Sequence, residues 1–395
     1  MGKTSSTHII FFVFLCLVST MIFNAAVINA WSMKFSLARS TVGRRYKYLH
    51  TSTVLHLNRF LFDPSEIDDD SLSNTEGCPI VTLPKSDYRT IHAAKILRLL
   101  NNDTLRAGIV LDNSIAMKTS HNNKFNQTII DGLIRPLSSN GDKFGGMITD
   151  KATITWIPEG NIKKAEPTKN GDPPGSLKIT LNELISSKDH DKNVSSHGDK
   201  SPQVSLILAL PRPLALGRLL PMISMMGIDH LVLTSAQKVP KDYFGSHLFR
   251  KPNQIRDLLI EGLCQAADVK IPSVTVVNRL KPFIEDDLDN LFPKHEWARV
   301  IAHPLRKDQN DDHKVLLMDD IQFPSPAMND ESQSYKPKIL LAVGPEGGWA
   351  EPYELDMFQE HGFQQITLGT RILRSDVAVI SLLSLAHDVC TRRSR

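Results

Sequence analysis

The chain has 395 residues, of which 41% are hydrophobic and 23% charged, and a formal net charge of +3 at pH 7. This length can bury full hydrophobic cores and predicts two domains. Residues 1–62 contain seven Lys or Arg and no Asp or Glu, so the rest of the chain is slightly acidic. That balance argues against an indiscriminate nucleic-acid binder, and any RNA contact would need a local basic patch.

The N-terminal segment has the pattern of a targeting sequence. Lys3 precedes an apolar run from Ile9 to Val18, and small residues before Trp31 offer a cleavage position. We therefore predict a signal peptide over residues 1–30, with no stable membrane association after cleavage. The acid-free, Ser- and Arg-rich segment 31–55 then completes a two-part address that resembles that of secondary plastids. Plastid is the predicted location, mitochondrion is the alternative, and an uncleaved signal anchor stays open.

A secreted glycoprotein is the competing interpretation of the same N-terminus. Three glycosylation sequons favour it, at Asn102, Asn126 and Asn193. Cysteine usage argues against it, because an odd number of cysteines follows the predicted signal peptide, without disulfide-scaffold spacing: Cys78, Cys264 and Cys390.

Residues 56–160 alternate short β-rich runs with polar loops, which predicts a small N-terminal β-barrel. The expected strands are Ile80 to Leu83, Gly108 to Leu111, Gly146 to Ile148 and Ala152 to Ile157, with an insertion around 114–126. Residues 161–202 are rich in Lys, Asp, Gly, Pro and Ser and are broken only by Leu177 to Ile185, so we expect a polar linker or insertion there.

From residue 203 to 395, strand-like segments alternate with helical ones, which predicts an α/β domain with a parallel sheet. The expected strands are Val204 to Ala209, His230 to Thr234, Ser273 to Val277, Arg299 to His303, Val315 to Met318 and Ile339 to Val343. Between Asn253 and Asp268, apolar residues at helical spacing predict one buried face, with Cys264 beside it. No Cys or His cluster has metal-ligand spacing, and we expect no metal.

Two segments near the C-terminus look like strand ends at one ligand site. The apolar run from Lys338 to Val343 ends in Gly344-Pro-Glu-Gly-Gly348, and a helix should follow from Glu351-Pro352 to Gly362. A second strand, Gln365 to Leu368, leads into a loop with two arginines and an aspartate before an apolar helix from Val377. Ligands of such sheets bind outside the carboxyl ends of the strands.

Two segments together resemble the C-terminal signature of the RsmE-like family. They are the run from Lys338 to Gly348 and the loop Leu368-Gly-Thr-Arg-Ile-Leu-Arg-Ser-Asp376. Members of this family are SPOUT-class methyltransferases that methylate N3 of a uridine in small-subunit (16S-type) ribosomal RNA. The resemblance covers most of residues 203–395, and a weaker one upstream, including Leu57 to Phe62 and His92 to Arg106, is to the family's PUA-like barrel. It implies a C-terminal SPOUT trefoil-knotted α/β domain, a small N-terminal PUA-like β-barrel and a homodimer.

The resemblance also implies S-adenosyl-L-methionine as methyl donor. The residues expected to bind it are Val343, Gly344, Pro345, Glu346, Gly347, Leu368, Gly369, Ile372 and Leu373. Arg374 is the main catalytic candidate, because a guanidinium facing the uracil oxygens would stabilise the developing anion. Asp376 would orient that arginine or accept the imino proton through water. Alternatively, Arg374 holds a phosphate or carboxylate, and Asp376 caps the following helix.

Basic residues on both domains are the expected RNA contacts, with a solvated surface as the alternative for each: Arg89, Lys95, Arg98, Arg106 and Arg371. Asp376 and Val377 depart from the family's usual Glu-Thr, so one hydroxyl is lost. The expected function is N3 methylation of a uridine in organellar small-subunit rRNA, free or in an assembled subunit. The alternative is a non-catalytic RNA-binding or ribosome-assembly factor that retains the SPOUT fold.

Overall fold

A computed structural model describes residues 59–68, 78–112, 141–160, 165–187, 203–251, 253–304, 316–325 and 336–394. The expected signal peptide (1–30), transit-like segment (31–55) and insertion (114–126) lie outside the described residues, as do two of the three sequons, at Asn126 and Asn193. Within the ranges that are described, no helix combines the length and the hydropathy that crossing a membrane requires.

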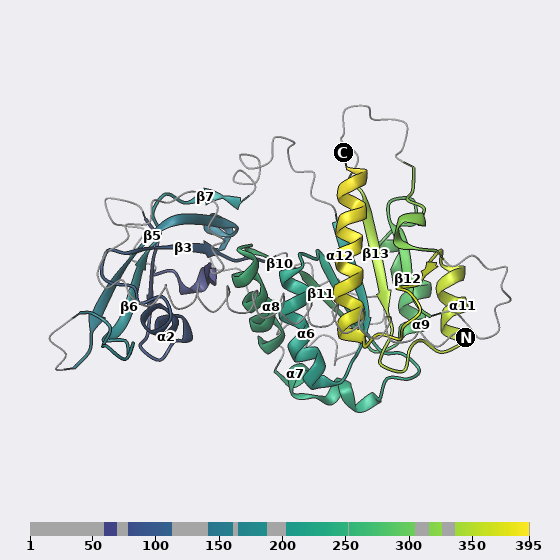
Figure 1. The fold of residues 1–395 in the computed structure, drawn as a ribbon, viewed down its shortest axis with the longest axis horizontal. Coiled ribbons are helices and arrows are strands. Elements are labelled where there is room, and N and C mark those ends of the chain that lie inside the picture. Colours follow the sequence, from purple (N-terminus) through teal and green to yellow (C-terminus); the bar gives the residue numbers. More distant parts are fainter. Residues whose placement is uncertain are drawn as a thin grey trace, which may run out of the picture. The chain divides into compact units, whose positions relative to one another are not determined.

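The N-terminal half forms a mixed sheet of six strands in the order β1-β3-β5-β6-β2, with β7 paired to β5 (Figure 1). β1 runs parallel to β3, and the other pairs are antiparallel. The strands are β1 (Phe60–Phe62), β2 (Ile80–Leu83), β3 (Thr104–Ile109), β5 (Met147–Pro158), β6 (Gly175–Thr180) and β7 (Ile185–Ser186). Three short helical elements accompany them, η1 (Pro64–Glu66), α2 (Tyr88–Lys95) and α4 (Gly141–Phe144).

This sheet extends further along the chain than the sequence predicts. The two strands expected within 146–157 are one continuous strand, β5. The segment expected as a linker, 161–202, contains β6, which pairs with both β5 and β2, and β7. β6 alternates buried and half-buried residues, as a strand with one face on a core does. The N-terminal sheet therefore continues to Ser186, past the boundary expected at residue 160.

The C-terminal half is an α/β domain, as predicted, built on six parallel strands in the order β11-β9-β8-β13-β12-β14. The strands are β8 (Gln203–Ala209), β9 (His230–Thr234), β11 (Ser273–Val277), β12 (Ala298–Ala302), β13 (Lys338–Val343) and β14 (Gln364–Ile366). Five of them are nearly continuous apolar runs, typical of strands buried on both faces.

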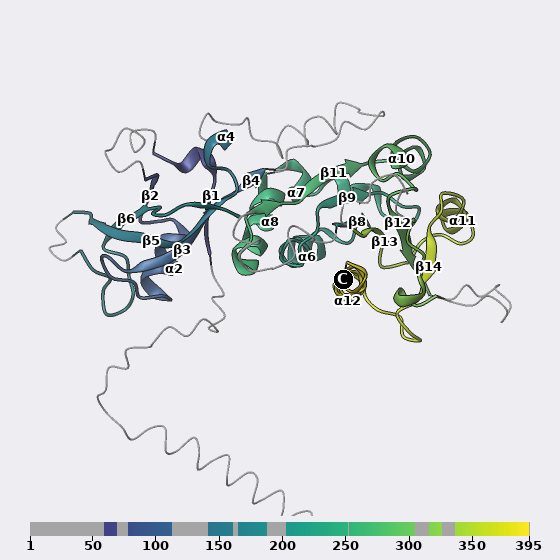
Figure 2. The ribbon, with the colours of Figure 1, turned by 90° about the horizontal axis from the view of Figure 1, so that it is seen from above.

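Helices cover this sheet. They are α6 (Pro213–Met225), α7 (His247–Arg250), α8 (Asn253–Ala266), α9 (Leu280–Pro282), α10 (Leu288–Leu291), α11 (Tyr353–Glu360) and α12 (Ser375–Arg393), with η3 (Lys241–Gly245), η4 (Phe283–Asp287) and η5 (Met318–Asp320). Figure 2 shows α6, α8 and α12 on one side of the sheet and α10 on the other. α12 begins two residues before the predicted start at Val377.

The strand predicted from Val315 to Met318 is wrong. In the described part of that segment, Leu316 makes a single parallel bridge to Ile366, and the chain then turns into η5. The turn is closed because the amide of Leu317 donates to the Asp320 carboxylate at 3.1 Å, and the amide of Asp320 donates back to the Leu317 carbonyl at 3.0 Å. These local bonds take the groups that a strand would use for pairing.

The N-terminal sheet meets the C-terminal half along β1, which packs against α8. Phe60 and Phe62 pack in the core of the N-terminal sheet, whereas Leu61 points the other way and joins the core of the parallel sheet. A two-stranded parallel ladder between β4 (Leu111–Asp112) and β10 (Lys270–Ile271) adds backbone pairing between the halves. At this junction a Cβ on Gly108 would lie 2.7 Å from the Val269 side chain, so only glycine fits.

Candidate functional site

The carboxyl ends of the parallel strands lie at one edge of the C-terminal sheet. Register pairs Val343 with Leu208 on one side and with Ala302 on the other, and Ala302 in turn pairs with Ile366. The glycine-rich loop after β13 and the arginine-bearing loop after β14 therefore leave the same edge. β12 lies between them, which separates the two strand ends by roughly 10 Å at the usual strand spacing.

The glycine-rich loop after β13 turns sharply over a buried tryptophan. The amide of Gly348 donates to the Pro345 carbonyl at 2.8 Å, and Gly348 has a φ of +67°, which a residue with a Cβ rarely adopts. A Cβ on Gly344 would lie 3.0 Å from the backbone nitrogen of Trp349. Trp349 is fully buried and packs edge to face on Phe358, with ring centroids 4.8 Å apart.

Two side chains that the sequence reasoning missed fasten this loop to the loop after β9. Glu354, 3% exposed on α11, accepts hydrogen bonds from the amides of Gln237 and Ala350, both at 2.7 Å. The Lys238 ammonium donates to the carbonyls of Gly347 and Trp349 at 2.9 and 3.1 Å. The sequence signal for Glu354 was its place on the buried face of a helix, because a buried carboxylate requires hydrogen-bond donors inside the protein.

Further contacts connect the other strand ends to the same edge. Glu346, predicted for donor binding or loop structure, is exposed and accepts a hydrogen bond from the amide of Arg212 at 3.1 Å. His303, directly after β12, donates its amide to the Ile366 carbonyl, and its Nε2 lies 2.9 Å from a Glu351 carboxylate oxygen. Loops following β8, β9, β12 and β13 are thus connected by polar contacts.

The loop after β14 carries the remaining residues of the predicted site. Leu368 and Leu373 are half-buried, whereas Ile372 is 88% exposed. Gly369 is exposed and has a φ of +103°, and its carbonyl accepts a hydrogen bond from the Thr367 hydroxyl at 3.0 Å. The expected donor-binding residues therefore occupy one sheet edge but contribute from two separate loops.

Arg374 and Asp376 form an ion pair at the start of α12. The guanidinium nitrogen lies 2.7 Å from the carboxylate oxygen, and the Arg374 side chain is 72% exposed. Arg374 itself is the N-cap residue, so Asp376 stands in the first turn and accepts from the amide of Val377 at 2.9 Å. The carboxylate thus contacts both the arginine and the helix backbone, while most of the guanidinium faces solvent.

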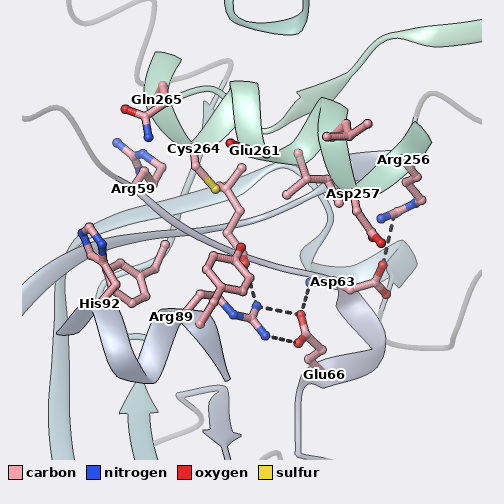
Figure 3. Close-up of a pocket in the computed structure, with 15 residues that line it drawn as sticks. Arg59, Asp63, Glu66, Arg89, His92, Arg256, Asp257, Glu261, Cys264 and Gln265 are labelled. Atoms are coloured by element: carbon pink, nitrogen blue, oxygen red, sulfur yellow. Dashed lines mark hydrogen bonds and ion pairs between the residues drawn. The ribbon is translucent and has the colours of Figure 1, made fainter. Parts of the chain in front are cut away.

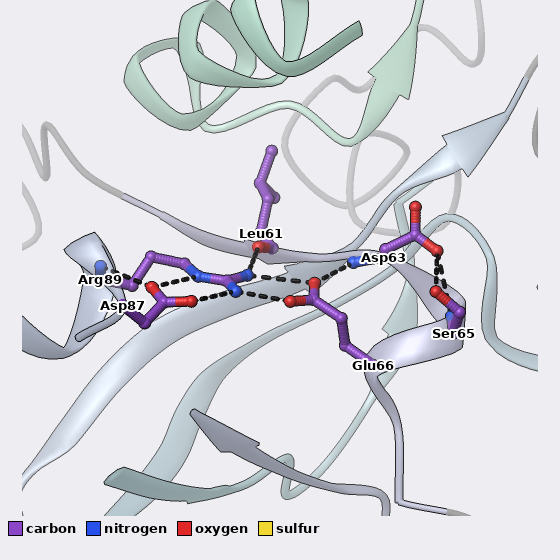
Figure 4. A network of polar contacts seen from close by, with 6 residues as sticks. All are labelled: Leu61, Asp63, Ser65, Glu66, Asp87 and Arg89. Atoms are coloured by element: carbon purple, nitrogen blue, oxygen red, sulfur yellow. Dashed lines mark hydrogen bonds and ion pairs between the residues drawn. The ribbon is translucent and has the colours of Figure 1, made fainter. Parts of the chain in front are cut away.

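The expected RNA contacts fall into different environments. Lys95, Arg98 and Arg371 are exposed, and Arg106 is half-buried beside Asp150. Arg89 instead lies inside a network within the N-terminal half, where Figure 4 shows its guanidinium between two carboxylates.

The N–H groups of the Arg89 guanidinium donate hydrogen bonds to acceptors within the protein. They reach both oxygens of Glu66, both oxygens of Asp87 and the Leu61 carbonyl. Burial, the largest single effect, lowers the pKa of Arg89, but the hydrogen bonds and charges of Asp87 and Glu66 together raise it above its usual value. Within the residues that the structure describes, no group of three or more His, Cys, Asp or Glu is placed to hold a metal ion.

Comparison with known proteins gives matches that include the C-terminal half. Residues 199–387 match the family model of the RNA methyltransferase domain. Ribosomal RNA small subunit methyltransferase E of Treponema pallidum is 27% identical over 186 residues, which are 46% of this chain and 62% of that protein. The protein of the same name from Mesomycoplasma hyopneumoniae is 49% identical over 45 residues, 11% of this chain and 19% of that protein.

The chain thus spans less than two thirds of the length of these relatives. Among solved structures, ribosomal RNA small subunit methyltransferase E from Neisseria gonorrhoeae, bound to S-adenosyl methionine, matches with a TM-score of 0.49 and 15% identity over 85% of this chain and 98% of that chain. Residues 199–387 thus match an RNA methyltransferase domain, and the chain is similar to proteins named ribosomal RNA small subunit methyltransferase E.

Proposed function

We propose that this protein transfers a methyl group from S-adenosylmethionine to N3 of a uridine in small-subunit ribosomal RNA. The observation that carries the proposal is the shared sheet edge, where a braced glycine loop follows β13 and the ion pair of Arg374 with Asp376 follows β14, with only β12 between these two strands of an RNA methyltransferase domain. The named relatives are small-subunit rRNA methyltransferases, which supports the substrate class.

The residues at this edge fit S-adenosylmethionine. Val343 and Pro345 supply a buried apolar wall, and Gly347, Gly348 and Gly369 leave backbone groups accessible. The loop can approach a ligand closely because two of these glycines have positive φ angles. When bound, S-adenosylmethionine supplies an electrophilic methyl group. The task left to the protein is to orient the uracil and stabilise its charge.

Arg374 performs the electrostatic part of that task. N3 of uracil must lose its proton as it is methylated, and negative charge then develops on the flanking carbonyl oxygens. An exposed guanidinium stays positive throughout and presents several donors to those oxygens. Asp376 restricts the orientations of the guanidinium, and water at the exposed edge takes the proton.

A homodimer is part of the proposal, because an apolar surface lies over two adjacent helices. α6 and α12 pack against each other, and both expose large apolar side chains: Leu214, Met222 and Met225 on α6, Val377 and Leu385 on α12. A symmetric pair of chains would cover this surface beside the Arg374 loop. Sedimentation velocity tests it: the wild type sediments as a dimer, and Met222→Lys/Met225→Lys as a monomer.

We also propose a plastid as the location and an assembled small subunit as the substrate. The acid-free N-terminus supports delivery to a plastid, and the slightly acidic remainder of the chain fits an RNA already packed into a small subunit better than free RNA. Tight binding of naked rRNA that persists at high salt would contradict the second part.

One observation favours a second candidate function, a ribosome-assembly factor without turnover. Val377 is 49% exposed at the start of α12, where it offers no hydroxyl. Such a factor would leave the methylation pattern of the RNA unchanged when deleted, whereas an enzyme would not.

Mass mapping of modified uridines in organellar small-subunit rRNA separates the two candidates. Loss of one N3-methyluridine on deletion, restored by the wild type and by Arg250→Ala but not by Arg374→Ala, supports the enzyme. Arg250 is an exposed arginine on α7 and serves as the matched control. Removing the charge of Arg374 should lower the transfer rate by about 100-fold or more. A map that does not change on deletion refutes the methyltransferase proposal.

A further inference from the structure

A cavity of about 760 Å³ lies between β1 and α2 of the N-terminal half and α8 of the C-terminal half, and none of the residues proposed for methyl transfer lines it. Figure 3 shows side chains from α8 and from the N-terminal half pointing into the same space. A cavity of this volume is in the range that holds a small ligand or several side chains of a peptide. Its walls include the rings of Phe60 and Tyr88 and the aliphatic side chains of Leu258 and Ile260.

The three arginines that line this cavity are already neutralised. Arg89 is held by Asp87 and Glu66, Arg59 by Asp150 at 3.2 Å, and Arg256 by Asp63 at 3.1 Å. Both Arg59 and Arg256 are nearly fully buried. These guanidinium charges are therefore offset by carboxylates at contact distance, and the cavity offers little to attract a phosphate group.

Two carboxylates that line the same cavity have no such compensation. Asp257 and Glu261 are exposed, lie four residues apart on α8, and make no hydrogen bond or ion pair with any described residue. At this spacing both face the same side of the helix. The cavity thus combines apolar walls with uncompensated negative charge, which selects a positive group carried on an apolar stem.

The wall of the cavity also contains a buried donor without an acceptor. Arg59 is 4% exposed, and its Nε–H has no hydrogen-bond partner within the described residues. Since its two terminal nitrogens already contact Ala107 and Asp150, the remaining donor suits one neutral acceptor. A peptide carbonyl is such an acceptor, and it would accompany a lysine or arginine side chain that reaches the carboxylates.

We propose that this cavity, formed by β1, α2 and α8, binds a basic, partly apolar peptide segment of a protein partner. Lysine or arginine side chains of the segment pair with Asp257 and Glu261, and its apolar side chains contact Leu258 and Tyr88. The inference goes beyond the proposed methylation, because it gives a cavity lined by both halves a protein ligand, whereas the proposed methylation involves only RNA and the methyl donor. A partner of this kind would be a basic protein on the particle that carries the target RNA.

The test uses the full chain and needs neither methyl donor nor methyl transfer, so its failure leaves the proposed function standing. The probe is a capped hexapeptide of alternating leucine and arginine, titrated by calorimetry. Its matched control replaces each arginine by citrulline, which has nearly the same shape and no charge. We expect saturable binding of the arginine peptide and binding at least about tenfold weaker for the citrulline peptide, because each ion pair contributes a several-fold factor.

Two variants locate the binding. Asp257→Asn/Glu261→Gln removes both charges at exposed positions and should weaken binding about tenfold. Asp242→Asn/Glu360→Gln, which neutralises two exposed carboxylates outside the cavity, should stay within about twofold of the wild type. Leu258→Trp keeps the charges but fills part of the cavity, and it should also weaken binding.

Three results would each overturn the proposal. The first is the absence of saturable peptide binding to the wild type at millimolar concentration. The second is equal peptide affinity for the wild type and both cavity variants. The third is a single-stranded RNA hexamer that displaces the peptide and binds less tightly to Leu258→Trp, which would assign the cavity to RNA.

Discussion

Replacing Glu354 with glutamine tests whether a buried carboxylate holds the glycine loop in the conformation described above. Glu354 accepts the amides of Gln237 and Ala350. Glutamine keeps one acceptor oxygen but turns its NH2 group toward the other amide, so that two donors face each other. A hydrogen bond to a charged group contributes about 1.5–3 kcal/mol, and a buried amide left unsatisfied costs about 1–3 kcal/mol. We therefore expect Glu354→Gln to lower the unfolding free energy by about 3 kcal/mol.

Thermal unfolding followed by circular dichroism measures this loss. A destabilisation of this size lowers the melting temperature of a domain of this length by about 6–12 °C. Glu360→Gln is the matched control, since Glu360 is exposed at the end of the same helix and should leave the melting temperature unchanged. Titration with S-adenosylmethionine should show weaker binding to Glu354→Gln. If Glu354→Gln and Glu360→Gln have the same melting temperature, the carboxylate of Glu354 does not brace the loop and the reasoning is refuted.

Three further predictions concern stability and the loop. Burial lowers the pKa of His230 from 6.5 to about 4, so between these pH values only the unfolded chain takes up the proton. The unfolding free energy should therefore have its full value above pH 6.5 and fall by about 3 kcal/mol as the pH drops to 4. Urea unfolding at several pH values measures this dependence, which should be absent in His230→Asn. Gly348→Ala should cost about 1–2 kcal/mol at its positive φ and weaken donor binding, whereas Gly217→Ala, in a helix with open space around it, should not. Arg256→Leu should lower the unfolding free energy by about 3 kcal/mol or more by leaving Asp63 without its buried ion partner, and Asp63→Asn added to it should restore part of the loss.

The sequence predicts the parallel sheet well because its strands are long apolar runs. β8, β9 and β11 fall within one residue of the predicted bounds, and a glycine ends the α11 segment where expected, at Gly362. The sequence does not predict β6, because its six residues lie in a segment rich in polar residues. Their alternation of apolar and polar side chains is too short to outweigh that composition. Pairing with β5 and β2 supplies the stabilisation that the local sequence does not show.

The candidate site was predictable only as far as its signals are local. The glycine loop and the Arg374 loop can each be recognised from local composition. The contacts that brace them cannot, because they join residues more than one hundred positions apart, such as Glu354 with Gln237 and Lys238 with Gly347. Arg89 shows that a residue predicted to contact RNA can instead have its partners inside the protein. An arginine in a saturated internal network and one on an RNA-facing surface look alike in sequence, and only burial distinguishes them.

The short ladder between β4 and β10 has a consequence for how the chain is made. Leu111 pairs with Lys270, and the Leu111 amide donates to the Val269 carbonyl at 2.8 Å. The N-terminal sheet therefore leaves the translating ribosome with Leu111 unpaired, until more than 150 further residues have followed. Closing so large a loop is slow and entropically costly, so the pairing of β4 waits until β10 has been synthesised. A protein assembled in this order exposes an open strand edge during synthesis, which is when chaperone protection matters most.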